Sequence, residues 1–284
     1  MAGMKLLARA VLLICAAAAQ PGPRMLRGFQ CVEHSQPWMV ALFDGLKFHC
    51  AGTLIHAQWL VTAAQCYTSR FLFARLGEHS LWHVEWTEQF KIATKAIWHP
   101  FYNSYTKDND IMLVKLLTPV RMNKNVRPLA LPRNCVPPGS YCVLAGWGIT
   151  ILQKEYMPDV LYCGNITTLP DQECSSAYPT VQLGHMLCAT VKQGGADSCQ
   201  PKRKIQAFSP NMSLHTRKIW VLLFIHGVIV MSLQGDPGSP LVCDGELQGI
   251  TSWGFEECSH VENPSVFVRV CNYIDWLQET MAWA

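Results

Sequence analysis

The chain has 284 residues, of which 50% are hydrophobic and 15% are charged, and its formal net charge is +3. That length can bury a large core, either as one catalytic-size unit or as two small domains. Three basic residues lie in residues 1–24, so the remaining chain carries 20 basic and 20 acidic side chains and is neutral. A neutral chain gives no reason to expect a nucleic acid or an anionic membrane as a partner.

The N-terminus predicts a secretory signal over residues 1–19. Lys5 and Arg9 precede or enter an apolar run that ends in the small residues Ala17 to Ala19, a pattern typical of signal cleavage. The run is shorter than the ~20 apolar residues of a comfortable membrane span, which favours a cleaved signal over an uncleaved anchor. We therefore expect a secreted, extracellular protein.

Cysteine usage agrees with export. Of the 13 cysteines, Cys15 lies inside the signal, which leaves an even set of 12. An even set in an exported chain predicts six disulfides. Because no CxxC pair occurs, a zinc site is not indicated, and neither a metal nor another cofactor is expected.

Short apolar or alternating runs, punctuated by Gly, Pro, Asn and Asp, follow one another from residue 37. They indicate an all-β fold, a sandwich or a barrel, which the pattern alone does not separate. Apolar residues at helical spacing predict an amphipathic terminal helix over 272–283. The predicted strands are 37–43, 48–55, 59–63, 88–97, 111–117, 141–147, 160–168, 241–243, 247–253 and 265–270.

Residues 201–234 differ from the rest of the chain. They contain five basic side chains, no acidic one and no cysteine, and residues 219–233 are almost wholly apolar. A run of about 15 apolar residues is short for a membrane span, and an exposed one is prone to aggregate. We interpret 201–234 as a 34-residue insert. It is either a true insertion or a translated intron, and its abrupt edges favour the intron.

Three stretches in chain order carry a resemblance to a known family. They are 59–66 (WLVTAAQC), 108–114 (DNDIMLV), and 197–200 (DSCQ) resumed at 235–240 (GDPGSP). They resemble the segments that carry the catalytic His, Asp and Ser of trypsin-like serine proteases of the tissue-kallikrein type. Shorter matches to the same family are His34–Trp38, Leu76–His79, Gly146–Gly148, Ser252–Gly254 and Asp275–Met281.

The resemblance covers about residues 25–200 and 235–284 and implies two antiparallel β-barrels packed face to face, with the active site between them. It implies a propeptide over 20–24 and a peptidase domain over 25–284, with barrels at about 25–126 and 127–270. The implied disulfides are Cys31–Cys163, Cys50–Cys66, Cys135–Cys271, Cys142–Cys243, Cys174–Cys188 and Cys199–Cys258.

The same resemblance places Gln65, Asp110 and Pro237 where the family has its catalytic His, Asp and Ser. An amide has no useful basicity, so Gln65 cannot accept and return a proton as an imidazole does. Pro237 has neither a hydroxyl nor a backbone N–H, and that N–H would be one oxyanion-hole donor. Gly235 would supply the other donor. Ser239, two residues after Pro237, would still face Gln65 and not a base.

Activation in this family frees an N-terminal amine that pairs with an Asp. The matching bond here is Arg24–Met25 and the matching acid is Asp236. Arg27 stands where the family has Gly, so insertion of this terminus is doubtful.

The specificity pocket would have Asp197 at its base, where a carboxylate selects Arg or Lys. Ser252, Gly254 and Ser265 would line it, with Ser265 in place of a usual Gly. We favour Asp197 as a relic over a surviving site. Asn165-Ile-Thr167 is also a glycosylation sequon.

Three hypotheses follow. We favour a monomeric, secreted protease homologue that has lost catalysis and binds basic peptide segments, protease inhibitors or protease partners. The second is an active endopeptidase that cleaves after Arg or Lys, and the third is an unstable product of a decayed gene or a retained intron.

Overall fold

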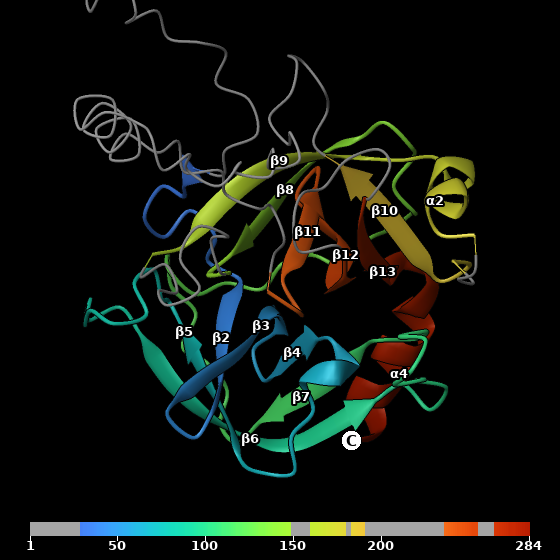
Figure 1. Ribbon diagram of the computed structural model, residues 1–284. Helices are drawn as coiled ribbons and strands as arrows, with labels where there is room; N and C mark the ends of the chain where they lie inside the picture. The colour runs from blue at the N-terminus through green and yellow to red at the C-terminus, as the bar shows by residue number, and fades with distance from the viewer. Residues whose placement is uncertain (1–28, 149–159, 180–182, 191–235, 255–263) are drawn as a thin grey trace, which may run out of the picture.

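A computed structural model describes residues 29–148, 160–179, 183–190, 236–254 and 264–284. They form two β-barrels that lie one above the other in Figure 1. Among these residues, no helix is long and apolar enough to cross a membrane.

The first barrel has six antiparallel strands that close in the order β2-β3-β4-β7-β6-β5. Its inward residues, such as Leu42, Leu60 and Leu113, are fully buried and form one apolar core. The strands are β2 (Met39–Asp44), β3 (Lys47–His56), β4 (Trp59–Thr62), β5 (Leu72–Leu76), β6 (Gln89–Trp98) and β7 (Met112–Leu116).

The second barrel is a ring of β8, β9, β10, β13, β12 and β11, because β8 pairs with both β9 and β11. The two-residue strand β1 (Phe29–Gln30) adds to β9. The ring strands are β8 (Tyr141–Gly146), β9 (Tyr162–Thr168), β10 (Met186–Thr190), β11 (Pro240–Cys243), β12 (Glu246–Trp253) and β13 (Ser265–Arg269).

The C-terminal helix crosses from the second barrel back to the first (Figure 1). A 3-10 turn, η2 (Val270–Tyr273), leads into α4 (Ile274–Trp283), and Leu277 is buried in the core of the first barrel. The ammonium groups of Lys95 and Lys115 donate to the terminal Ala284 oxygen at 2.7 and 3.0 Å. These contacts fasten the helix that continues from the second barrel to the core and surface of the first barrel.

The predicted all-β class is confirmed, and the open choice between a sandwich and a barrel is resolved in favour of two barrels. The terminal helix is also present, although its α-helical part begins at Ile274 and not at residue 272. Four elements were not predicted: β1, β5, β10 and the seven-residue helix α2 (Asp171–Ala177). Each is too short to show a clear period along the chain. The three strands form because neighbouring strands supply their hydrogen-bond partners, whereas α2 is closed by its own backbone hydrogen bonds.

Five of the six implied disulfides are confirmed. They are Cys31–Cys163, Cys50–Cys66, Cys135–Cys271, Cys142–Cys243 and Cys174–Cys188. The sixth, Cys199–Cys258, lies outside the described residues, as does the insert 201–234. Five disulfides in one domain fit a protein of an oxidising, extracellular environment.

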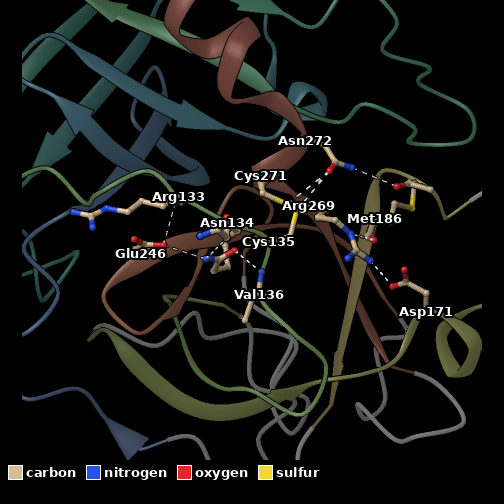
Figure 2. The surroundings of a disulfide bond; sticks show 12 residues. Arg133, Asn134, Cys135, Val136, Asp171, Met186, Glu246, Arg269, Cys271 and Asn272 are labelled. Carbon is tan, nitrogen blue, oxygen red and sulfur yellow. Dashed lines mark hydrogen bonds and ion pairs between the residues drawn. A yellow bond between two sulfur atoms is a disulfide. The ribbon is translucent and has the colours of Figure 1, made fainter.

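Figure 2 shows how Cys135–Cys271 fastens the segment between the barrels to η2. The neighbouring Gln248 side chain accepts from the Val136 amide at 3.1 Å and donates to the Asn134 carbonyl at 3.1 Å. On the other side, Arg269 donates to the Met186 carbonyl at 3.0 Å. The connection between the barrels is therefore held by covalent and polar links on both flanks.

Candidate active site

Gln65 sits in η1 (Ala64–Cys66), a single turn directly after β4 that faces the second barrel. Its side-chain amide donates to Asp110 Oδ2 at 2.8 Å and to the Ser252 carbonyl oxygen at 2.6 Å. Its backbone N–H donates to Asp110 Oδ1 at 2.8 Å. Both N–H groups of the amide are thus used, and the side chain bridges the two barrels.

Asp110 lies just before β7 and is fully buried. The preceding Asn109 has a left-handed backbone (φ 55°) and is anchored by the Tyr273 hydroxyl, which donates to its Oδ1 at 2.9 Å. Ser252 lies where the register of β12 against β13 shifts, and its hydroxyl donates to Asp110 Oδ2 at 2.5 Å. A bulge of this kind re-aims a side chain, and here it closes the network around the carboxylate.

Burial raises the pKa of the Asp110 carboxyl, and the hydrogen bonds from Ser252 and Gln65 partly oppose that rise. In a proton relay, such a buried carboxylate orients an imidazole and stabilises the imidazolium. Its partner here is an amide, which has no lone pair of useful basicity. The polar groups of Gln65, Asp110 and Ser252 therefore have hydrogen-bond partners. Gln65 nevertheless offers no group that can take a proton from a hydroxyl.

Pro237 lies on the tight turn that precedes β11, half-buried against the first barrel. Its carbonyl accepts from the Ala51 amide at 3.0 Å and lies 3.7 Å from the sulfur of Cys66, the neighbour of Gln65. The turn therefore meets the segment that carries Gln65. At its centre, however, it presents a pyrrolidine ring without a hydroxyl or an N–H.

Ser239 does not replace the missing hydroxyl. Its side chain is fully buried, and its Oγ is packed against Gly146, where an added Cβ would come within 3.0 Å of it. Among the described residues this Oγ has no hydrogen-bond partner. A nucleophile must reach a substrate, so the position of Ser239 argues against that role.

We expect Ser239→Ala to be neutral or to stabilise the protein by up to about 1 kcal/mol, because it removes a buried hydroxyl that has no partner. Chemical unfolding with the disulfides intact would measure the change. A loss of more than about 1 kcal/mol would mean that the hydroxyl has a bonding partner in solution.

Asp236 is buried beside this turn. Its Oδ2 accepts from the Trp147 amide at 2.6 Å, and its backbone carbonyl accepts from the Ser239 amide at 2.9 Å. Burial raises the pKa of its carboxyl to about 7, against the opposing backbone hydrogen bonds. Among the described residues it makes no ion pair, so this carboxylate would gain from a cationic partner.

Gly254, directly after β12, lies beside Ser265, the first residue of β13. A Cβ built on Gly254 would lie 3.4 Å from the Ser265 Cα and 3.7 Å from its Oγ. The Ser265 side chain therefore occupies space that a glycine would leave open. It narrows the predicted specificity pocket beside Gly254.

The comparisons with known proteins agree with this geometry. The family model described as Trypsin matches residues 25–201 and 228–277. Serine protease 1 of Rattus norvegicus is 40% identical over 273 residues, which is 95% of this chain and 96% of that protein. Kallikrein-11 of Homo sapiens is 40% identical over 262 residues, 91% of this chain and 80% of that protein. The chain belongs to the trypsin family.

A solved structure gives the same result. Neuropsin, a serine protease expressed in the limbic system of mouse brain, has a TM-score of 0.72 and 34% identity, and the likeness covers 90% of this chain and 100% of that chain. The match of the trypsin family model leaves out residues 202–227, which lie within the predicted insert 201–234.

The structure brings together Gln65, Asp110 and Ser252, sets Pro237 beside them, and pairs Gly254 with Ser265. Asn165 lies on β9 with its side chain exposed. Six predicted site residues of this trypsin-family chain lie outside the described residues: Arg24, Met25, Asp197, Gly235 and the cysteine pair Cys199–Cys258.

Two functional contacts were not foreseen. The Ser252 hydroxyl was assigned only to the pocket, yet it bonds Asp110 across 142 residues. Trp147 holds Asp236 across 89 residues. No local pattern signals either contact, because both depend on how the two barrels are closed.

The titration of Asp236 predicts a pH dependence of stability. Its folded pKa of about 7 lies above the ordinary 3.8 of an aspartate, so its contribution is present at low pH and is lost as pH rises through about 7. We expect this group to lower the free energy of unfolding by about 2–3 kcal/mol between about pH 5 and about pH 8.

Asp236→Asn should flatten that part of the profile, measured by chemical unfolding of the uncleaved chain at several pH values. An unchanged profile would contradict the assignment. If cleavage after Arg24 flattens the wild-type profile, the new Met25 amine pairs with Asp236. If cleavage leaves the profile unchanged, the new N-terminus at Met25 does not pair with Asp236.

Proposed function

We propose that this protein is a secreted serine-protease homologue without proteolytic activity. The observation that carries the proposal is the double change at the reacting centre: Gln65 where a base is needed and Pro237 where a nucleophile is needed. Proteolysis in this family needs a group that takes the proton of a hydroxyl and returns it to the leaving amine. Neither the hydroxyl nor the base is supplied at these positions.

The oxyanion hole argues in the same direction. An enzyme of this kind that loses its triad residues still accelerates the reaction to some extent, because the oxyanion-hole donors and substrate binding remain. The prolyl nitrogen of Pro237 removes one donor, and loss of one donor typically costs about 10²–10³-fold in rate. The changes at Gln65 and Pro237 therefore weaken both triad catalysis and the residual catalysis by the oxyanion hole.

The test uses the full chain, secreted by cultured cells and purified, before and after cleavage at Arg24. It is incubated with a fluorogenic peptide that ends in Arg, with and without a serine-directed inhibitor. We expect no turnover above that of a mock purification. Turnover that the inhibitor abolishes would favour the alternative, an active endopeptidase that cleaves after Arg or Lys.

We further propose that the retained framework binds basic peptide segments, as in a protease inhibitor or a protease partner. The support is the match of Asp197 to the acid of the specificity pocket, which this proposal takes as a surviving site and not as the relic favoured from the sequence. The Gln65 side chain, which bridges the two barrels through Asp110 and Ser252, supports a retained framework. The Ser265 side chain favours a shallow contact over full insertion of a long side chain.

Binding of a fluorescent Arg-containing peptide, followed by anisotropy, tests this second part. Asp197→Asn is the matched variant, because it removes the charge and keeps the volume. We expect a loss of at least about 10-fold in affinity, as for a cation that loses its carboxylate. Equal binding by both proteins would remove Asp197 from the proposal, whatever the result of the activity assay.

Secretion itself is tested by expression with the native N-terminus. Recovery of a monomeric, protease-resistant protein from the medium supports a folded homologue. Retention inside the cell would favour the third hypothesis, an unstable product of a decayed gene or a retained intron.

A further inference from the structure

Five large apolar side chains gather on the outer surface of the first barrel at β5 and β6. The strand register sets Phe73 opposite Ile92, and the Leu117 amide donates to the Ile92 carbonyl at 2.8 Å. Phe71 and Phe90 lie two residues from Phe73 and Ile92, and alternate residues of a strand share a face. All five are exposed to solvent, and we call this surface the β5–β6 face.

The β5–β6 face is large for an exposed apolar surface. Its members Phe71, Phe73, Phe90, Ile92 and Leu117 are 74, 40, 71, 42 and 56% exposed. With about 200 Å² for a large side chain, these fractions amount to roughly 500 Å² per chain. The largest apolar patch on a typical monomer is about 300–600 Å² and often serves an interaction. The size of the β5–β6 face therefore indicates a docking surface.

The cation in the middle of the face is compensated within the chain. The Arg75 guanidinium lies 4.6 Å from the centroid of the Phe43 ring and 5.1 Å from that of the Phe90 ring. It also donates to the Glu78 carboxylate at 2.8 Å. The centre of the β5–β6 face therefore carries no free charge that would select an acidic partner.

The charges at the edges of the face have partners as well. Beside Phe71, the Arg70 guanidinium lies 4.0 Å from the Asp44 carboxylate. At the Leu117 edge, the Lys91 ammonium donates to the Thr118 hydroxyl at 3.1 Å and to the Pro119 carbonyl at 2.8 Å. Charges at the rim of an interface contribute little to binding, so the face can meet a copy of itself without strong repulsion.

The β5–β6 face lies away from the candidate active site. Round the first barrel, β5 is the strand farthest from β4, which leads to Gln65. β6 lies on the side of this barrel away from the second barrel (Figure 1). A contact through this face therefore leaves the Gln65 network uncovered, and it does not depend on whether the protein cleaves or binds a peptide.

We propose that the β5–β6 face is the contact between two copies of this chain, related by a two-fold axis. Such a contact sets the same surface of both copies against each other. Roughly 500 Å² on each copy gives roughly 1,000 Å² in total, the lower limit of a specific interface. Without residues 1–24 the chain carries 20 basic and 20 acidic side chains, so two copies do not repel each other through net charge.

An interface of this size is weak, so the dimer dissociates on dilution. Dilute protein is then the monomer that the sequence analysis predicts, and the dimer forms as the concentration rises.

The test is sedimentation velocity of the full, purified chain over a wide range of concentration, with and without sodium sulfate. We expect a monomer that converts reversibly to a dimer. Sulfate strengthens the burial of apolar surface and screens charges, so it should preserve or strengthen the dimer. A dimer that dissociates in sulfate would contradict an apolar contact.

Phe71→Ser and Phe90→Ser each remove an exposed apolar side chain from the face of both copies. Each should raise the dimer dissociation constant by at least about 10-fold, as loss of a central interface contact does. Phe101→Ser is the matched control, because Phe101 is 76% exposed and lies beyond the far end of β6, outside the face. It should associate as the wild type does. Cooperative unfolding of each variant shows that the change lies in association and not in folding.

Residues 219–233 are a second apolar stretch of this chain, so a chain without 201–234 is the remaining arm of the test. We expect it to dimerise as the full chain does. A folded chain without 201–234 that stays monomeric would overturn the proposal, because that segment would then be the contact. A full chain that is monomeric at every concentration would also overturn it and leave the face to a different partner. Equal dimerisation of the wild type, Phe71→Ser and Phe90→Ser would overturn it as well.

Discussion

A chain that carries Gln65→His and Pro237→Ser and lacks residues 201–234 should cleave an Arg peptide, whereas the native chain should not. The change restores a base, a hydroxyl and a backbone N–H at one centre. Asp110 is already placed to orient the new imidazole, because its Oδ2 accepts from the Gln65 side chain at 2.8 Å and from Ser252 at 2.5 Å. The expected gain in kcat/KM is about 10⁴-fold or more, in line with the joint effect of triad members.

The single repairs separate the contributions. Triad residues act as a unit and are far from additive, so either change alone should leave most of the gain unrealised. Asp110→Asn in the repaired chain is the matched control and should lower the rate by about 10⁴-fold, because it favours the wrong imidazole tautomer. If the repaired chain folds, as judged by cooperative unfolding, yet stays inactive, the lack of activity has another cause, such as Arg27 or Ser265.

Local patterns were enough to predict most of the fold. The short apolar runs of β2, β3 and β12 are buried on both faces for most of their length, and the helical spacing of the C-terminal segment places Leu277 in the core. β5 was missed although Leu72, Ala74 and Leu76 point inward, because five residues give too few repeats to stand out. The hydrophobic pattern of the sequence could not predict that each sheet closes into a barrel, because closure depends on pairings such as β8 with both β9 and β11.

The site was predicted residue by residue from motifs, but not its contacts. The resemblance to trypsin-like proteases implied in advance that Gln65, Asp110 and Pro237 lie near one another. The burial of Ser239 and the contact of Ser252 with Asp110 arise only when strands far apart in sequence are packed.

Gly238→Ala should destabilise the protein more than any other small substitution in this turn, by at least about 4 kcal/mol. Gly238 has φ +87°, and a Cβ there would lie 2.2 Å from both the Ala51 carbonyl oxygen and the Thr62 hydroxyl. These two atoms are themselves hydrogen-bonded at 2.7 Å. Neither can withdraw without opening β3 or β4, so the added methyl group has no space.

Gly139→Ala separates backbone strain from this steric conflict. Gly139 has a similar φ of +81°, but a Cβ there would meet nothing within 4 Å. It should cost only the strain of a left-handed alanine, about 1–2 kcal/mol. Unfolding with the disulfides intact gives both values, and equal small losses would mean that the turn can shift away from β3. A much larger loss at Gly238 would mean that the turn is held rigidly against the barrel that carries Gln65. The chain would then keep the backbone geometry on which a nucleophile depends while presenting Pro237 in its place.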